Sequence, residues 1–332
     1  MTERVRRRRV ALGLSQADIA AASGLSRQLV GTVETGRHVP NVGAALALAR
    51  ALETTVEDLF GSPAGGWEEV FGRTTAEGTA LHAARVGYRR VYTPVPNHGD
   101  AGFGWQRADG VFRGGRVELL TGVEPEGFAV GGCDPALGLA SSFLPQAGPG
   151  RVVAVAATST DAAEALAGGR LHAALIHGRA ETISPPTSDV VRRSLGRWQV
   201  GVAGRAVRPV DLDLISSGRA TVARLASGAE AQKALERALP ERGSISIKGP
   251  IASGHLESAR LVSYGVADFG VVMDPAARAY GLEFLPLEEH LVVLDIGKAW
   301  TDHPGARLGD LFSSRAFARR LGTVGGYELS LS

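Results

Sequence analysis

The stretch LSQADIAAASGLSRQLVGTVETGRHVP, residues Leu14–Pro40, decides how the N-terminal part of the chain folds. Its apolar residues are spaced as in two short helices joined by a tight turn. Ser15 and Ser26 each precede a helix and can cap it through the hydroxyl group. Gly24 can adopt the left-handed conformation that such a turn needs, and Leu25 would fill the angle between the helices. The pattern is that of a helix-turn-helix.

In a helix-turn-helix, the second helix enters the major groove of DNA. Here that helix is predicted over residues 27–34, with Val30 and Val33 on its buried face. Arginine can pair with guanine, glutamine with adenine, and an apolar side chain can contact the methyl group of thymine. Gln16, in the preceding helix, is expected to reach a phosphate and to brace Gln28. The predicted DNA-binding residues are Gln16, Ser26, Arg27, Gln28, Leu29, Thr32 and Arg37.

Several motifs at the right mutual spacing make residues 4–60 resemble the phage-repressor-like (XRE) family of DNA-binding domains. They are LSQADIA, GLSRQLV, the turn ETGR, and the helix ALALARAL with its VEDLF end. The resemblance implies a helical domain that binds double-stranded DNA. Arg8 departs from the family, which usually places an apolar residue there, and Leu12 would carry that packing instead. The alternative is a helical bundle that binds no nucleic acid.

Length, net charge and cysteine content limit the classes of protein to which this chain can belong. Its 332 residues are enough for two or three domains, and a net charge of +2 argues against a general binder of polyanions. Seven arginines against three acidic residues in the first 40 positions make a local basic patch. Cys133 is the single cysteine, so no intrachain disulfide can form. The sequence has no signal-peptide pattern and no apolar run of about 18 residues, so we expect a cytoplasmic protein without a membrane partner.

The remaining sequence predicts a multidomain chain. After the all-α helix-turn-helix domain, residues 1–60, comes a linker, GSPAGG at 61–66. Short apolar stretches around a Gly-Gly turn predict a small β-rich connector over 67–126. From residue 127 to 332, strands alternate with helices, which predicts an α/β domain with largely parallel sheets.

The α/β domain contains a repeated pattern. A helix, a glycine turn and a strand are predicted over 164–176 and again over 259–272, which suggests two similar lobes or one duplicated unit. Two separate strands, 282–285 and 291–296, are then predicted, followed by one closing helix, 308–320.

Polar residues follow several predicted strands, at the positions where α/β sheets bind ligands. Many of them begin helices, whose free N–H groups and partial positive charge suit a small anion. Each hydroxyl or carboxylate could instead be an ordinary N-cap. The predicted ligand-binding residues are Cys133, Asp134, Thr158, Ser159, His177, Ser253 and His255.

Histidine and cysteine side chains in this region could also be metal ligands or catalytic groups. His172 and His177 flank a short strand that would direct them to opposite faces, so we expect no shared metal. Cys133 could be a nucleophile at a helix start, where a thiol pKa falls, but no base is adjacent in sequence. We therefore predict no catalytic residue, no metal site and no cofactor.

Residues 127–329 resemble the type 2 periplasmic-binding-protein-like domain that follows helix-turn-helix domains in some bacterial regulators, and within it the molybdate-binding-protein branch. The motifs include VGGCDPALGLASSF, EALAGGRLHAALIHG and GPIASGHLESARLVSYGVADFGVVMDPAA. The resemblance implies two α/β lobes around a ligand cleft, with a middle lobe at about 202–262. It also implies that the chain crosses between lobes near 196–201 and 263–265.

Molybdate relatives hold their oxyanion with hydroxyl groups and backbone amides, which implies this role for the three hydroxyl residues among the predicted ligands. Cys133, His177 and His255 depart from such a set, so a different small polar ligand is an equal alternative to molybdate or another oxyanion.

Together these features predict a ligand-responsive transcription regulator, not an enzyme. Its partners would be double-stranded DNA, bound as a homodimer at a pseudo-palindromic operator, and a small-molecule effector. One alternative is an enzyme that acts through Cys133 and regulates its own gene. Another is a regulator whose α/β domain serves only for assembly.

Overall fold

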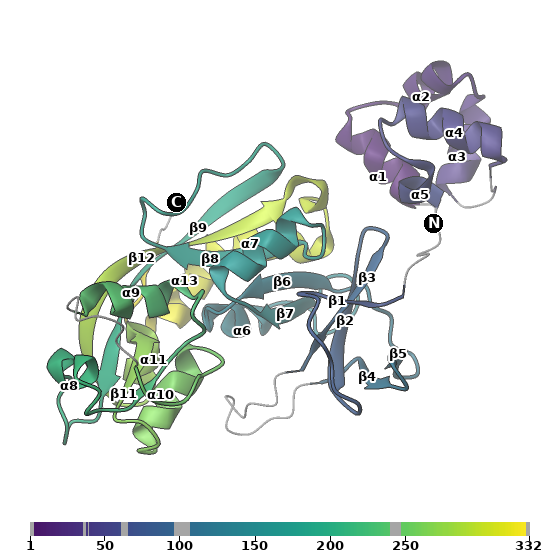
Figure 1. The fold of residues 1–332 in the computed structure, drawn as a ribbon. Coiled ribbons are helices and arrows are strands. Elements are labelled where there is room, and N and C mark those ends of the chain that lie inside the picture. Colours follow the sequence, from purple (N-terminus) through teal and green to yellow (C-terminus); the bar gives the residue numbers. More distant parts are fainter. Residues whose placement is uncertain are drawn as a thin grey trace. The chain divides into compact units, whose positions relative to one another are not determined.

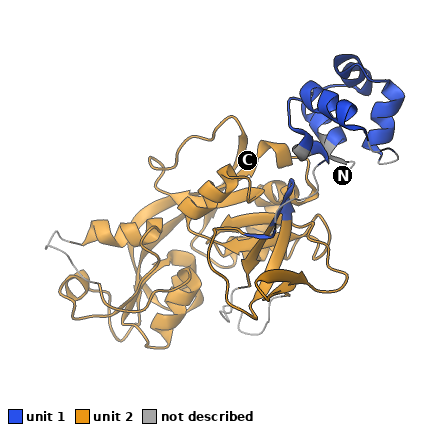
Figure 2. Cartoon of the chain, turned by 45° about the vertical axis from the view of Figure 1, so that its right-hand side comes forward, with its two compact units in different colours: residues 1–68, 85–90 blue, residues 69–84, 91–332 orange. Residues whose placement is uncertain are grey.

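The computed structural model of the chain describes residues 3–35, 38, 40–60, 66–95, 107–239 and 247–329. These residues divide into two compact units, one formed by 1–68 with 85–90 and the other by 69–84 with 91–332 (Figure 2). All but Gly66 of the predicted linker lies outside the described residues. Within the described part, no helix is long and apolar enough to cross a membrane.

The N-terminal residues form a bundle of short helices (Figure 1). The helices are α1 (Glu3–Ala11), α2 (Gln16–Ser23), α3 (Arg27–Glu34), α4 (Val42–Ala51) and α5 (Val56–Phe60). Their shared core is apolar, and its most buried members are Val5, Ile19, Val30, Leu48 and Leu52. The predicted all-α domain is therefore confirmed.

The turn between α2 and α3 has the predicted chemistry. The Ser15 hydroxyl accepts a hydrogen bond from the Asp18 N–H at 3.2 Å, and the Ser26 hydroxyl accepts one from the Leu29 N–H at 3.1 Å. Gly24 has φ = +68°, a conformation that costs glycine little because it has no Cβ. These caps satisfy N–H groups at the helix starts and so set where each helix begins.

Arg8 departs from the family pattern and has a structural role of its own. Its Nε donates to the Leu52 carbonyl at 2.9 Å, and a terminal nitrogen donates to the Glu53 carbonyl at 3.0 Å. These carbonyls follow the end of α4, where no helical N–H remains to bind them. Leu12 packs partly against the core, as expected.

The connector is a five-stranded sheet in the order β1-β3-β2-β4-β5. Its strands are β1 (Glu68–Glu69), β2 (Ala80–Val86), β3 (Arg89–Pro94), β4 (Gly110–Arg113) and β5 (Arg116–Leu119). The predicted Gly-Gly turn joins β4 and β5, and both glycines have positive φ. Asp109, just before β4, forms two 2.6 Å hydrogen bonds with Arg151, which joins this sheet to the α/β domain.

The α/β domain is built on one mixed sheet in the order β10-β11-β9-β12-β8-β6-β7, with β13 paired to β9. Its strands are β6 (Phe128–Gly132), β7 (Val152–Ala156), β8 (Ala173–Gly178), β9 (Val190–Gly204), β10 (Val222–Ala223), β11 (Phe269–Met273), β12 (Glu283–Gly297) and β13 (Glu328–Leu329). Its α-helices are α6 (Ala136–Ser141), α7 (Ser159–Ala167), α8 (Leu212–Ser216), α9 (Glu230–Ala238), α10 (His255–Ser263), α11 (Asp274–Ala279), α12 (Arg307–Phe312) and α13 (Arg315–Gly322).

The centre of this sheet differs from the prediction of largely parallel sheets. Strands β9 and β12 are 15 residues each and pair antiparallel, and only the flanking pairs β10–β11, β6–β7 and β6–β8 are parallel. The two strands predicted at 282–285 and 291–296 are one strand, β12. The polar run Glu288-Glu289-His290 interrupts the apolar pattern there, but its main chain stays in the ladder with β9.

The long strands β9 and β12 run through two lobes (Figure 1). The first lobe holds β6, β7, β8, α6, α7, α12 and α13, and the second holds β10, β11 and α8 to α11. The second crossing lies in β12, so the crossing expected at 263–265 was wrong, and the second lobe continues beyond residue 262 to β12. Gly169 and Gly265, both with positive φ, occupy matching turns between a helix and a strand, as the repeated pattern predicted.

The predicted closing helix is two helices, α12 and α13. Ser314 interrupts it by capping α13, since its hydroxyl accepts a hydrogen bond from the Phe317 N–H at 3.2 Å. Both Phe312 and Phe317 are buried in the main core of the α/β domain.

Candidate functional site

The outer face of α3 is the candidate DNA-binding surface. Ser26, Arg27 and Gln28 are exposed, whereas Val30 and Val33 are buried in the helical core, as the spacing predicted.

Two other predicted contacts on α3 are less accessible. Leu29 is half-buried and packs partly against the core, and the Thr32 hydroxyl donates to the Leu29 carbonyl at 2.9 Å. Arg37 lies outside the described residues.

A buried carboxylate fixes α3 against its neighbours. Arg9 donates to both Glu34 oxygens at 2.6 and 3.1 Å, and the Gln16 amide donates to one of them at 2.7 Å. Burial opposes ionisation of Glu34, but the hydrogen bonds from Arg9 and Gln16 outweigh it and hold its pKa below the usual value. The structure therefore gives the Gln16 amide nitrogen a partner at the end of α3, and that Gln16 also braces Gln28 stays a prediction. The signal for this network was an acidic residue on the buried side of a predicted helix.

In the α/β domain, three predicted ligand-binding residues converge, and we call them the Cys–His cluster: Cys133, His177 and His255. Cys133 follows β6 and His177 lies near the end of β8, both in the first lobe, while His255 opens α10 in the second. The Cys133 Sγ is 3.1 Å from the His177 Nε2, and one candidate donor atom of each residue lies within 4.8 Å of the others.

Two aromatic residues from the crossing strands line the Cys–His cluster. Trp198 of β9 and His290 of β12 are partners in the ladder, and their rings lie 4.7 and 5.2 Å from the His177 ring, centroid to centroid. The Nδ1 atoms of His177 and His290 are 3.0 Å apart. His290 Nε2 lies 3.4 Å from Glu288, which Arg237 holds through two hydrogen bonds of 2.7 and 2.8 Å. The sequence reasoning missed this arrangement, because its members are joined only by the tertiary fold.

Burial keeps the Cys–His cluster uncharged. It lowers the pKa of His177 well below the usual range, with help from the neighbouring imidazoles, and lowers that of His255 to about 3. Burial, and secondarily the charge of Asp134, raises the pKa of the Cys133 thiol to about 12. Neutral imidazoles are the form that binds metal ions, whereas a thiol with this pKa is a poor nucleophile at neutral pH.

Asp134 was predicted to bind ligand, but the structure gives its carboxylate a different role. Its oxygens accept hydrogen bonds from the Trp198 indole at 2.9 Å, the Tyr327 hydroxyl at 2.6 Å and the Ala136 N–H at 2.8 Å. Both oxygens are thus occupied, and Asp134 positions Trp198 beside the Cys–His cluster.

The predicted hydroxyl ligands do not form a free oxyanion set. The Thr158 hydroxyl caps α7 by accepting from the Asp161 N–H at 3.1 Å. The Ser159 hydroxyl exchanges two 3.0 Å hydrogen bonds with the main chain of His177. Ser253 is exposed, and the structure shows no hydrogen bond of its hydroxyl among the described residues.

His172 lies apart from His177, as their spacing predicted. Its Nδ1 accepts from the Ala129 N–H at 2.9 Å, and its ring stacks on Phe128 at 4.9 Å in the core of the first lobe.

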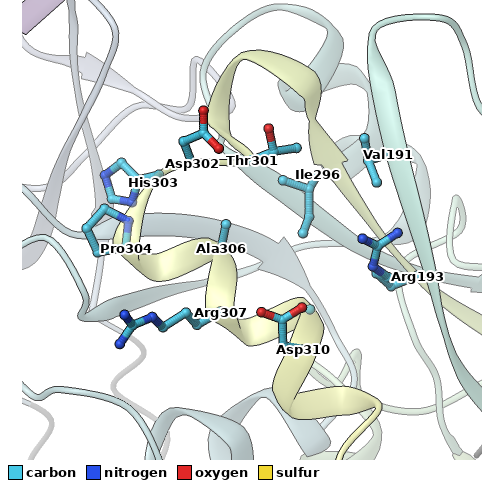
Figure 3. A pocket seen from close by; sticks show the side chains of 11 residues that line it. Val191, Arg193, Ile296, Thr301, Asp302, His303, Pro304, Ala306, Arg307 and Asp310 are labelled. Carbon is cyan, nitrogen blue, oxygen red and sulfur yellow. The ribbon is translucent and has the colours of Figure 1, made fainter. Parts of the chain in front are cut away.

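The α/β domain contains two pockets of interest. A small one, about 70 Å³, lies between α6 and α13 of the first lobe and α10 and α11 of the second, and we call it the interlobe pocket. Its lining residues are Pro135, Ala136, Leu139, Leu256, Pro275, Ala276, Ala279, Leu321, Val324 and Tyr327. A larger pocket, about 280 Å³, lies in the first lobe beside α12 and contains none of the predicted site residues (Figure 3).

Comparisons with known proteins agree with both parts of the chain. The helix-turn-helix domain family matches residues 1–59, and the PBP superfamily domain matches residues 140–308, just over half of the chain. The uncharacterized HTH-type transcriptional regulator YgzD of Bacillus subtilis (strain 168) is 33% identical over 60 residues, which cover 18% of this chain and 91% of YgzD.

Solved structures fall into the same two groups. The restriction-modification controller protein C.AhdI from Aeromonas hydrophila is 42% identical over 18% of this chain and 89% of its own, with a TM-score of 0.17. An ABC-type phosphate transport receptor from Vibrio cholerae is 12% identical over 61% of this chain and 100% of its own, with a TM-score of 0.43. The chain belongs to the PBP superfamily and is a helix-turn-helix transcription regulator fused to a PBP-like domain.

Proposed function

We propose that the protein is a ligand-responsive regulator that binds a pseudo-palindromic operator as a homodimer and senses a small polar or charged ligand between the lobes of its α/β domain. In this proposal the protein catalyses no reaction. DNA binding is the output, and closure of the lobes around the ligand is the input.

The observation that carries the proposal is the rigid presentation of α3. Val30 and Val33 are buried beneath it and the Glu34 network ties it to α1 and α2, while Arg27 and Gln28 remain exposed. Side chains that read bases must be held in a fixed register, and Arg and Gln match guanine and adenine in the major groove. One short helix reads few base pairs, which supports a dimer on two half-sites.

The position of the Cys–His cluster supports the sensing part. Its members come from both lobes, beside the strands β9 and β12 that connect them. A ligand that contacts both lobes binds the closed arrangement better than the open one, and this difference is what can shift the equilibrium. Coupling to DNA then requires only that the two arrangements differ in operator affinity.

The test begins with selection of binding sites from random duplexes by the full-length protein. We expect two related half-sites with centres one helical turn apart, protected together in a footprint and bound by two chains. A single asymmetric half-site bound by one chain would contradict the dimer, and no enrichment at all would contradict specific DNA binding.

An enzyme remains the second candidate, because a thiol 3.1 Å from an imidazole is the arrangement of a nucleophile and its base. The raised pKa of Cys133 and the lowered pKa of His177 both oppose formation of the thiolate–imidazolium pair. Turnover of a small ester or amide that is abolished by alkylation of Cys133 would favour the enzyme over the sensor.

A further inference from the structure

The Cys–His cluster has the donor atoms of a metal centre. One sulfur and two imidazole nitrogens lie within 4.8 Å of one another, and His177 and His255 are 4% and 1% exposed. Thiolate and imidazole together select soft and borderline transition metals over Mg²⁺ or Ca²⁺, which prefer oxygen.

His255 provides a second, independent sign of a missing partner. Its Nδ1 is buried and makes no hydrogen bond to any described residue. A buried polar atom without a partner costs free energy, and most native structures avoid it unless a ligand, water or ion completes the site.

The hydrogen bonds around His177 prepare its Nε2 to bind a cation. Glu288 can only accept, so the His290 Nε2 must donate to it, which leaves the neutral His290 with an acceptor at Nδ1. The His177 Nδ1 must then donate to His290, and the lone pair of the His177 Nε2 faces Cys133. This tautomer follows from the network, and a metal-binding histidine typically has its other ring nitrogen held in this way.

The interlobe pocket is too small for an organic metabolite. The interlobe pocket is lined by Pro135, Ala136 and Leu256, close in sequence to Cys133 and His255. Its volume of about 70 Å³ is far below the roughly 300 Å³ at the lower end of organic-ligand pockets.

We propose that Cys133, His177 and His255 bind a borderline transition-metal cation, represented by Zn²⁺, which joins the two lobes of the α/β domain. A tetrahedral zinc centre places its ligand atoms about 3.3–3.6 Å apart, so from a separation of at most 4.8 Å His255 needs to approach the other two by no more than about 1.5 Å. The Cys133 sulfur binds as the thiolate and releases its proton to solvent, and water takes the fourth position. A regulatory effect of the ion on DNA binding rests on the proposed function. Binding of the ion to the Cys–His cluster is independent of it.

The binding test uses Co²⁺ as a spectroscopic probe and Zn²⁺ as its competitor, on full-length protein stripped with chelator under reducing conditions. We expect one Co²⁺ per chain, a sulfur-to-cobalt charge-transfer band and the d–d absorption of a tetrahedral ion, all removed by one equivalent of Zn²⁺. A titration without the charge-transfer band would overturn the proposal.

Three variants show whether these residues form the site. Cys133→Ser should remove the charge-transfer band, and His255→Ala should weaken Zn²⁺ binding at least as much as the roughly 10–100-fold loss expected for His290→Phe, which removes only a partner of His177. The control is His172→Asn, which changes a buried histidine outside the Cys–His cluster and keeps an acceptor for the Ala129 N–H. Equal affinities of Cys133→Ser, His255→Ala and this control would overturn the site.

Operator affinity, measured with Zn²⁺ and with chelator, separates this inference from the proposed function. A Zn²⁺-dependent change in the wild type that is absent in Cys133→Ser supports both. A Zn²⁺ site without any change in operator affinity overturns the regulatory role of the ion and leaves the metal site standing. Loss of the metal site, with operator affinity that still responds to another small molecule, overturns the inference and retains the proposed function.

Discussion

The helical domain and the α/β domain differ in whether their buried polar side chains have hydrogen-bond partners. In the helical domain, Glu34 receives hydrogen bonds from Arg9 and Gln16, and Arg27 and Gln28 are exposed on the outer face of α3. In the α/β domain, His177 and His255 are buried between two lobes beside the half-buried Cys133, and the Nδ1 of His255 has no partner among the described residues. The Glu34 network satisfies its own hydrogen bonds and supports the exposed face of α3. The Cys–His cluster has a donor atom without a partner, which a bound ligand would supply.

The largest effect is expected at the buried ion pair that joins the connector to the α/β domain. Asp109 is 1% exposed and binds the half-buried Arg151, so Asp109→Ala leaves that guanidinium without its carboxylate partner and should lower the free energy of unfolding by about 3–5 kcal/mol. All four tryptophans lie outside α1–α5, so their fluorescence in a urea titration follows this part of the chain.

The matched control is Arg73→Ala, which breaks an ion pair with Asp161 whose side chains are 61% and 36% exposed. It should cost less than about 1 kcal/mol. Similar losses in the two variants would show that the buried pair contributes no more than an exposed one.

The pH dependence of the Asp109 effect follows from its pKa. Burial raises this pKa, but the nearby His82, whose Nδ1 lies 3.7 Å from the carboxylate, and the hydrogen bonds from Arg151 outweigh burial and hold it well below the ordinary 3.8. The stabilisation is therefore complete above pH 3.8 and is lost as the pH falls through the lower folded-state pKa. The difference between wild type and Asp109→Ala should shrink only under strongly acidic conditions, and a difference that shrinks already above pH 5 would contradict this assignment.

A smaller effect is expected from Glu34→Gln in the helical domain. Arg9 keeps an acceptor but loses its charged partner, so the free energy of unfolding should fall by about 1.5–3 kcal/mol. The folded-state pKa of Glu34 is lowered, so this stabilisation is present above the ordinary value of 4.5 and disappears as the pH falls below it. Circular dichroism of residues 1–60 made as a separate fragment would measure it, provided that the fragment unfolds cooperatively.

Glu53→Gln is the control for this variant, because it makes the same chemical change at an exposed side chain. It should leave the unfolding transition within about 0.5 kcal/mol of the wild type. If both variants behaved alike, the Glu34 network would not be what fixes α3.

The sequence predicted more of the structure in the helical domain than in the α/β domain, because helix signals are local whereas the contacts of the Cys–His cluster are long-range. The bounds of α3 were predicted to the residue, because caps, turns and helical periodicity act within a few positions. The three members of the Cys–His cluster were predicted as ligands, but their contact was not, since Cys133 and His177 are 44 residues apart. His290, 113 residues from His177, was missed, because it lies in a polar run that looked like a loop between two strands.

The exposed face of α3 offers a test of binding instead of stability. Gln28→Ala should weaken operator binding by about 1–3 kcal/mol, or roughly 5- to 150-fold, while binding to scrambled DNA stays nearly constant, because base contacts provide specificity. Arg50→Ala, at an exposed position on α4, is the control. Equal losses of Gln28→Ala on operator and scrambled DNA would mean that Gln28 does not read bases.

The smallest expected effect, from substitutions of Thr158, tests whether its hydroxyl caps a helix or binds a ligand. The Thr158 hydroxyl caps α7, so Thr158→Ala should cost about 1 kcal/mol of stability and Thr158→Ser, which keeps a hydroxyl, much less. Neither variant should change Zn²⁺ affinity, because the hydroxyl is committed to the Asp161 N–H. An oxyanion site predicts the reverse: Thr158→Ala would lose affinity for molybdate in calorimetry with little loss of stability. That result would mean that the α/β domain uses its helix N-termini, not its thiol and imidazoles, to recognise a ligand.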